Sequence, residues 1–206
     1  MNLPTQLTVL RIILTPVFLV LLFSDGLPFK ILSFMVYTVA SLTDWYDGYY
    51  ARKYGTVSKC GKFLDPLADK ILVSAAFIAF HILGYVQLWA VLIIVIRDFL
   101  ITGLRSYALF KNQPVVTIYL AKVKTFIQMG AVYIIYSIFL LKQYALLKEK
   151  DFFILNFLEE IRFIERLMLL IIILTIYTGG RYLIENRSQI ISAIKAFYHV
   201  FVPSDL

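Results

Sequence analysis

Four aspartates within residues 41–70 have the spacing of paired carboxylate ligands. Asp44 and Asp47 are three residues apart, and Asp65 and Asp69 are four apart. At either spacing, two side chains on a helix point in the same direction. Carboxylates held close together repel one another unless cations lie among them, and ligand sets made only of oxygen suit magnesium, calcium or manganese rather than zinc. Two divalent ions would balance the four negative charges, and a metal pair of this kind promotes displacement at phosphorus.

The sequence on both sides of these aspartates is very apolar. The chain has 206 residues, of which 61% are hydrophobic, and its mean hydropathy is +0.82. These values exclude an ordinary soluble domain and indicate helices of about 20 apolar residues that cross a bilayer. An aspartate at the bilayer centre costs roughly 2.5–3.5 kcal/mol, so aspartates near a membrane usually have a function or a partner. We therefore expect a single all-α integral membrane domain, residues 1–206, in which the aspartates form a site.

Six transmembrane helices joined by short connections are expected to position the site. Their approximate bounds are 7–23, 31–51, 66–83, 88–109, 119–141 and 166–183. Residues 142–165 and 190–202 mix charged with apolar side chains and predict short amphipathic helices on the membrane surface. Pro66 suits the first position of the third span, with Asp65 as its N-cap. Arg11 either snorkels from the first span to the interface or faces the site, and we favour snorkelling.

Basic residues gather at the connections after the second and fourth spans. They are Arg52, Lys53, Lys59, Lys62, Lys70, Arg105, Lys111, Lys122 and Lys124. The positive-inside rule then places both termini and the aspartates in the cytoplasm. The net charge of +7 reflects these connections and attraction to anionic headgroups, so we expect membrane lipids as partners and no nucleic acid. Cys60 is the only cysteine, which excludes an intrachain disulfide.

The spacing D-x2-D-G-x2-A-R-x8-G-x3-D-x3-D resembles the signature of the CDP-alcohol phosphatidyltransferase family. All eight fixed positions, which span 44–69, are present: Asp44, Asp47, Gly48, Ala51, Arg52, Gly61, Asp65 and Asp69. The resemblance implies that the four aspartates bind two ions, magnesium or manganese, and that Asp69 also takes the proton of the acceptor hydroxyl. It further implies that CDP-diacylglycerol is bound by Gly48, Ala51, Arg52 and Gly61. The competing interpretation is a capped helical hairpin with surface acids, whose small residues serve helix packing.

A second group of charged residues suggests an anionic acceptor. The runs NLPTQLTVLR, DPLADKILVSAA, IRDFLITGLR and AKVKT resemble the branch of this family that uses sn-glycerol 3-phosphate. The resemblance implies that Arg105 and Lys122 bind the acceptor phosphate, with Lys124 as a further candidate. All three side chains could instead anchor a cytoplasmic connection. For Arg97 and Asp98 we favour a buried ion pair in the fourth span.

The function implied is transfer of a phosphatidyl group from CDP-diacylglycerol to sn-glycerol 3-phosphate with release of CMP. The resemblance also implies a homodimer in the bacterial inner membrane, multi-pass, with its active site facing the cytoplasm. It weakens beyond residue 142. One alternative is a sister transferase with another acceptor, such as phosphatidylglycerol in a cardiolipin synthase. A cation transporter is a remote alternative, because it would spread its acids along a path across the bilayer.

Overall fold

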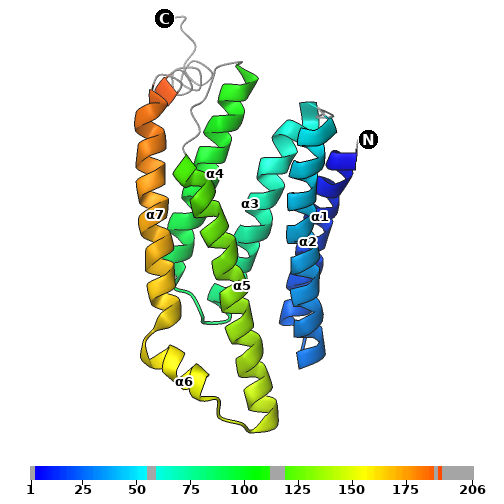
Figure 1. The fold of residues 1–206 in the computed structure, drawn as a ribbon, viewed down its shortest axis with the longest axis vertical. Coiled ribbons are helices and arrows are strands. Elements are labelled where there is room, and N and C mark those ends of the chain that lie inside the picture. Colours follow the sequence, from blue (N-terminus) through cyan, green and yellow to red (C-terminus); the bar gives the residue numbers. More distant parts are fainter. Residues whose placement is uncertain (1–2, 55–58, 112–118, 188–189, 192–206) are drawn as a thin grey trace, which may run out of the picture.

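The structure, a computed structural model, describes residues 3–54, 59–111, 119–187 and 190–191, with the backbone alone at 3–5, 44–54, 59–66, 109–110 and 119. Every element in these ranges is a helix. The helices are α1 (Leu3–Phe23), α2 (Leu27–Tyr54), α3 (Lys59–Ile82), α4 (Leu88–Phe110), α5 (Tyr119–Lys148), α6 (Phe153–Glu160) and α7 (Phe163–Glu185). The long helices alternate in direction within one bundle, and α6 lies across its lower end (Figure 1). The prediction of an all-α fold is confirmed.

Two glycines allow the tight turns that were predicted between the early spans. Gly26 has a φ of +99° between α1 and α2, and Gly84 has a φ of +80° between α3 and α4. Side chains with a Cβ rarely adopt this left-handed backbone, so glycine permits a short connection. The ring nitrogen Nδ1 of His81 lies 2.9 Å from the carbonyl oxygen of Val86 and closes the second turn. These turns hold α1 antiparallel to α2, and α3 antiparallel to α4.

The predicted helix boundaries were wrong at several points. α1 and α2 begin at Leu3 and Leu27 instead of near residues 7 and 31, and α2 continues to Tyr54. α3 begins at Lys59, so Pro66 lies inside the helix and Asp65 is not its N-cap. The proline removes one backbone donor, a loss that helices packed in a membrane bundle tolerate. α5 continues to Lys148 instead of ending near residue 141, because the added residues include good helix formers such as lysine, leucine and alanine. α7 begins at Phe163, slightly before the expected start at residue 166.

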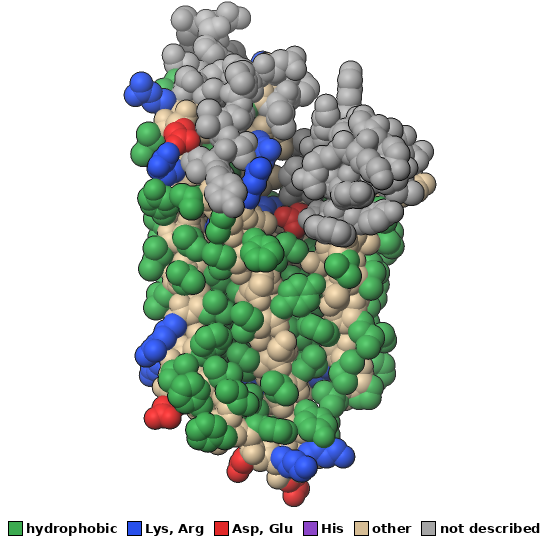
Figure 2. Space-filling model, viewed as in Figure 1, with side chains coloured by type: hydrophobic (Ala, Val, Ile, Leu, Met, Phe, Trp, Pro, Cys, Tyr) green, Lys and Arg blue, Asp and Glu red, His purple; other side chains and the backbone are tan. Residues whose placement is uncertain are grey.

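Three helices in the described ranges are long and apolar enough to cross a membrane: Gln6–Phe23 of α1, Leu120–Lys148 of α5 and Phe163–Glu185 of α7. The described side chains of α2 contribute a shorter apolar segment, Leu27–Thr43. α4 carries Arg97, Asp98 and Arg105 among its apolar residues. Figure 2 shows hydrophobic side chains over the middle of the bundle and charged ones mainly toward its two ends. This distribution fits a membrane protein, and the count of six spans stays a prediction.

An aromatic cluster in the core fixes the helices that lead to the aspartates. The ring centroids of Phe18 and Tyr37 are 5.4 Å apart, and those of Phe80 and Tyr136 are also 5.4 Å apart. The hydroxyl of Ser33 donates a 2.8 Å hydrogen bond to the carbonyl oxygen of Phe18. These contacts join α1, α2, α3 and α5 by close, directional packing. This packing therefore fixes the helices whose ends carry the aspartates.

Arg11 does not snorkel, and the preference for that interpretation was wrong. Its side chain is fully buried on α1. α1 packs against both α2 and α3, so a side chain on that face is enclosed by helices before it can reach an interface. The guanidinium is thus part of the interior of the bundle.

The segment predicted to be amphipathic forms a short helix between two turns. Glu149 and Arg162 have φ values of 49° and 46°, and these left-handed residues turn the chain at either side of α6. Within α6, Leu155 is buried, whereas Phe153 is 84% exposed. Lys142 of α5 forms a salt bridge with Glu159 of α6, which ties this helix to the bundle. The C-terminal surface helix predicted at 190–202 lies outside the described residues, apart from its first two.

Candidate functional site

The four signature aspartates lie on two neighbouring antiparallel helices. Asp44 and Asp47 belong to the last turns of α2, and Asp65 and Asp69 belong to the first half of α3. The backbone is helical at all four positions, so the two spacings do place each pair on one side of its helix. α2 and α3 contact each other. Two helices thus bring carboxylate-bearing positions to the same end of the bundle.

Of the four aspartates predicted to bind metal ions, Asp69 is the one whose side chain the structure describes. The side chains of Asp44, Asp47 and Asp65 lie outside the described part of the structure, and that of Asp69 is partly buried, with 16% of it exposed. Among the side chains that are described, no three Asp, Glu, His or Cys residues form a group that could hold a metal ion. Four carboxylates on adjoining helices have the hard oxygen chemistry that magnesium and manganese prefer. The residue types and helix register therefore fit such ions, and the ligand set stays a prediction.

The residues predicted to bind CDP-diacylglycerol lie beside the aspartates along the chain. Gly48, Ala51 and Arg52 are in the last turns of α2, and Gly61 is in the first turn of α3. Only their helical backbone is described. Their role is thus supported by position in the helices and stays a prediction.

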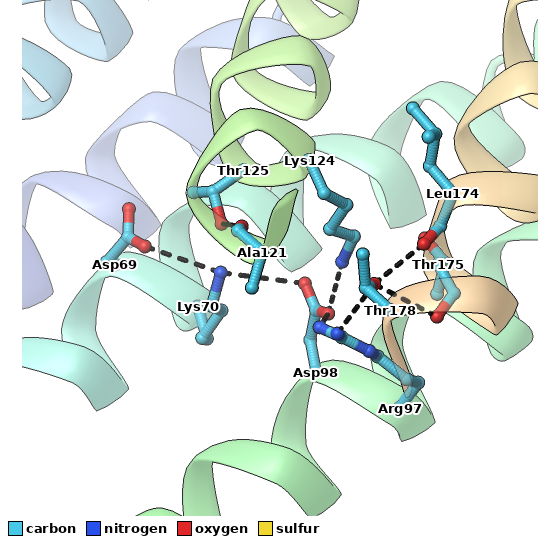
Figure 3. A network of polar contacts seen from close by, with 10 residues as sticks. All are labelled: Asp69, Lys70, Arg97, Asp98, Ala121, Lys124, Thr125, Leu174, Thr175 and Thr178. Atoms are coloured by element: carbon cyan, nitrogen blue, oxygen red, sulfur yellow. Dashed lines mark hydrogen bonds and ion pairs between the residues drawn. The ribbon is translucent and has the colours of Figure 1, made fainter. Parts of the chain in front are cut away.

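Lys70 connects Asp69 to the interior of the bundle. Its Nζ lies 3.6 Å from Oδ2 of Asp69 and 3.6 Å from Oδ2 of Asp98 in α4, and Figure 3 shows the ammonium between the two carboxylates. Only 14% of the Lys70 side chain is exposed. From the sequence, Lys70 was predicted to be one more positive charge at the cytoplasmic side. In the sequence, the one indication that Lys70 lies near the site was its position directly after Asp69.

Asp98 is the centre of a buried ion cluster. Its side chain is 2% exposed and lies between Lys70, Arg97 and Lys124. Nη1 of Arg97 donates a 3.0 Å hydrogen bond to Oδ1 of Asp98, and Nζ of Lys124 donates to the same oxygen. A carboxylate buried this deeply needs such partners, because its transfer from water is otherwise very unfavourable. The predicted Arg97–Asp98 pair is confirmed, and the two lysines were not foreseen.

Arg97 extends the cluster to α7. Its Nη2 donates a 2.8 Å hydrogen bond to Oγ1 of Thr178, whose own hydroxyl donates to the carbonyl oxygen of Leu174. A Cβ added to Gly179 would lie 3.4 Å from Cγ and from Nε of Arg97, so the absence of a side chain there lets the arginine lie close against α7. The polar network seen in Figure 3 therefore links α3, α4, α5 and α7. Nothing in the sequence near Thr178 indicated its partner.

The three basic residues predicted to bind an acceptor phosphate differ in their surroundings. Arg105 near the end of α4 and Lys122 near the start of α5 are exposed. Lys124 is 1% exposed and is directed at Asp98. Arg105 and Lys122 are thus accessible to an anion at the end of the bundle where the aspartates lie, whereas Lys124 already pairs with a carboxylate.

Comparison with known proteins adds an independent observation. Residues 1–155 match the CDP-alcohol phosphatidyltransferase family. A CDP-diacylglycerol–glycerol-3-phosphate 3-phosphatidyltransferase of Bacillus subtilis (strain 168) is 40% identical over 143 residues, which cover 64% of this chain and 74% of the relative. The protein of that name in Rickettsia typhi is 40% identical over 134 residues, 65% of this chain and 75% of its own. A probable phosphatidylglycerophosphate synthase of Mycobacterium tuberculosis (strain CDC 1551 / Oshkosh) is 35% identical over 134 residues, 64% of each chain.

Proposed function

This chain belongs to the CDP-alcohol phosphatidyltransferase family, and from that membership we propose that it is a phosphatidylglycerophosphate synthase. It transfers the phosphatidyl group of CDP-diacylglycerol to sn-glycerol 3-phosphate and releases CMP. The observation that carries this proposal is the complete eight-residue signature, whose aspartates lie on the adjoining helices α2 and α3. Bacterial relatives named for the same reaction support it.

Asp44, Asp47, Asp65 and Asp69 are the residues that would hold the divalent ions, two magnesium or manganese ions in this proposal. When bound, such ions hold the diphosphate of the donor lipid and stabilise the negative charge that develops on the departing CMP. Gly48, Ala51 and Gly61 leave room for the donor near the helix backbone, since larger side chains would obstruct it. Arg52 offers a planar pair of donors for a phosphate.

Asp69 is proposed as the general base. Its carboxylate accepts the proton of the acceptor hydroxyl, and the hydroxyl oxygen forms a new bond to the phosphorus that carries diacylglycerol. The bond from that phosphorus to the oxygen of CMP breaks, and CMP departs with the electron pair. Asp69 is suited to this role because its side chain is partly exposed, at 16%, and the acceptor can approach it.

Arg105 and Lys122 are proposed to bind the phosphate of the acceptor. Both side chains are exposed, and an arginine can donate two parallel hydrogen bonds to a phosphate. Lys124 is the less direct candidate, since its ammonium already donates to Asp98. It contributes positive charge from beneath the site. An acceptor that lacks a phosphate has no need of these cations.

We propose six membrane spans, formed by α1, α2, α3, α4, α5 and α7, with the aspartates facing the cytoplasm. The alternating direction of these helices supports that count, as does the gathering of basic residues at the connections on the aspartate side. The names and sources of the relatives favour the inner membrane of a bacterium. A homodimer is proposed from the family resemblance alone.

The proposal is tested by transfer of radiolabel from sn-glycerol 3-phosphate into lipid. Purified protein in mixed micelles receives CDP-diacylglycerol and Mg²⁺, and labelled lipid and CMP are both measured. We expect equal amounts of the two products, and no product after chelation of the metal. Release of CMP with phosphatidylglycerol but not with glycerol 3-phosphate would indicate the cardiolipin synthase type of activity. Metal flux through proteoliposomes without CMP release would indicate the transporter.

A further inference from the structure

We infer that Asp98 is a positioning residue for Asp69: it shares the ammonium of Lys70, and so leaves the carboxylate of Asp69 available to a divalent ion. This inference rests on the proposed function, because it concerns the same site. It assigns a role in metal binding to a residue of α4 that lies outside the signature. Asp98 would act through Lys70 and would not touch the metal or the substrate.

The geometry around Lys70 is the first support. Its Nζ is 3.6 Å from the nearest oxygen of both Asp69 and Asp98. Direct hydrogen bonds between nitrogen and oxygen measure about 2.7–3.2 Å, so Lys70 is committed to neither carboxylate. The side chain is 14% exposed, which leaves little water to solvate the ammonium. Its position therefore depends on the balance between the two aspartates.

The charges within the cluster are the second support. Asp98 faces three cations, namely Lys70, Arg97 and Lys124. If the carboxylate of Asp98 were removed, Arg97 would keep its hydrogen bond to Thr178. Among the carboxylates described, Lys70 would keep only Asp69 as a partner, and the two would pair fully. An ammonium bound to Asp69 competes with a metal ion for the same oxygens and repels the ion.

The test measures binding of Mn²⁺ to the purified protein by electron paramagnetic resonance, without substrates. Asp98→Asn should weaken binding roughly 10- to 100-fold, the usual effect of removing a residue that supports a metal ligand. At saturating Mn²⁺ the variant should recover most of its turnover, since its defect lies in metal affinity. Asp98→Glu keeps the carboxylate and should recover most of the binding. Asp25→Asn is the matched control, because Asp25 is an exposed aspartate of the α1–α2 turn and should have no effect.

A second substitution separates this role from simple support of the fold. Lys70→Met removes the ammonium that Asp98 is inferred to restrain, so Asp98→Asn combined with Lys70→Met should bind Mn²⁺ at least as tightly as the wild type. If Asp98 only stabilised the bundle, the added substitution would restore nothing, and that result would overturn the inference. If Asp98→Asn does not fold, Lys70→Met alone remains informative: equal or tighter binding supports the inference, and weaker binding overturns it.

Failure of this inference differs from failure of the proposed function. A wild-type protein that neither binds Mn²⁺ nor transfers label contradicts the proposed function, and the inference falls with it. A wild-type protein that does both, together with a folded Asp98→Asn variant that binds Mn²⁺ as tightly, overturns the inference alone.

Discussion

Arg97 of α4 reaches across to α7, where its Nη2 donates a 2.8 Å hydrogen bond to Oγ1 of Thr178. The two residues are 81 positions apart in the sequence. Their contact joins the buried Asp98 cluster to the last long helix of the bundle. This link therefore holds α4, the helix that carries Arg105, against α7.

The first prediction concerns this hydrogen bond. Thr178→Val keeps the shape of the side chain but removes the acceptor, and we expect a loss of about 1–2 kcal/mol in stability, since the lost bond involves a charged donor. The thermal unfolding midpoint in detergent measures it. Thr38→Val is the control, because the hydroxyl of Thr38 donates to the carbonyl oxygen of Phe34 in its own helix. Equal losses in the two variants would show that Arg97 does not depend on Thr178.

The second prediction uses two adjacent glycines of α7. A Cβ at Gly179 would lie 3.4 Å from Arg97, whereas a Cβ at Gly180 would meet nothing within 4 Å. Gly179→Val should therefore displace the arginine and destabilise the protein by about 1–3 kcal/mol, as overpacking does. Gly180→Val carries the same change in helix propensity without that contact. A midpoint that falls as far for Gly180→Val as for Gly179→Val would contradict the close packing of Arg97.

The third prediction concerns the metal-binding aspartates. Asp44→Asn should lower CMP release roughly 100- to 1,000-fold, because one charged ligand at the diphosphate is lost. Chelation should abolish the activity of the wild type, with recovery on addition of Mg²⁺ or Mn²⁺, since the ligands are carboxylate oxygens. Asp25→Asn serves as the control at the opposite end of the bundle. Near-normal turnover by a folded Asp44→Asn variant would refute a role for Asp44 in metal binding.

The fourth prediction concerns recognition of the acceptor. Arg105→Gln and Lys122→Gln should each raise the KM for glycerol 3-phosphate about 10-fold, the effect of removing one charge-assisted contact, and leave the KM for CDP-diacylglycerol unchanged. Lys111→Gln removes an exposed cation directly after α4 and controls for a general loss of positive potential. If all three variants raised the KM alike, the cations would act as a diffuse field and not as a binding site.

The fifth prediction concerns α6. Phe153 and Phe157 are exposed on this helix, with ring centroids 6.4 Å apart, and we expect them to lie in the lipid interface. A spin label at Phe153→Cys, in a Cys60→Ser background, should be accessible to oxygen and protected from a water-soluble nickel reagent. A label at Glu160→Cys, also exposed, should show the opposite pattern. Equal accessibility to nickel at both positions would place α6 in water.

Much of the organisation could be predicted because it depends on local properties of the chain. Hydropathy predicted an all-helical membrane protein, and the spacing of Asp44, Asp47, Asp65 and Asp69 predicted two carboxylate pairs on helices. Helix ends were less predictable: α3 already begins at Lys59, although Pro66 was expected to be its first residue. Arg11 was misread because periodicity along one helix does not show which face the other helices cover.

The sequence by itself determined the class of fold, the family and the chemistry of the signature, because residue types at fixed local spacing specify them. Only the tertiary structure decided the partners of Lys70 and Lys124. Lys70 was predicted to be one more cytoplasmic cation and Lys124 to be a candidate ligand of the acceptor phosphate. The packing of α3, α4 and α5 placed both against Asp98. The physical reason is that the free energy of a buried charge depends on groups brought from distant segments, and no local pattern records which segments will meet.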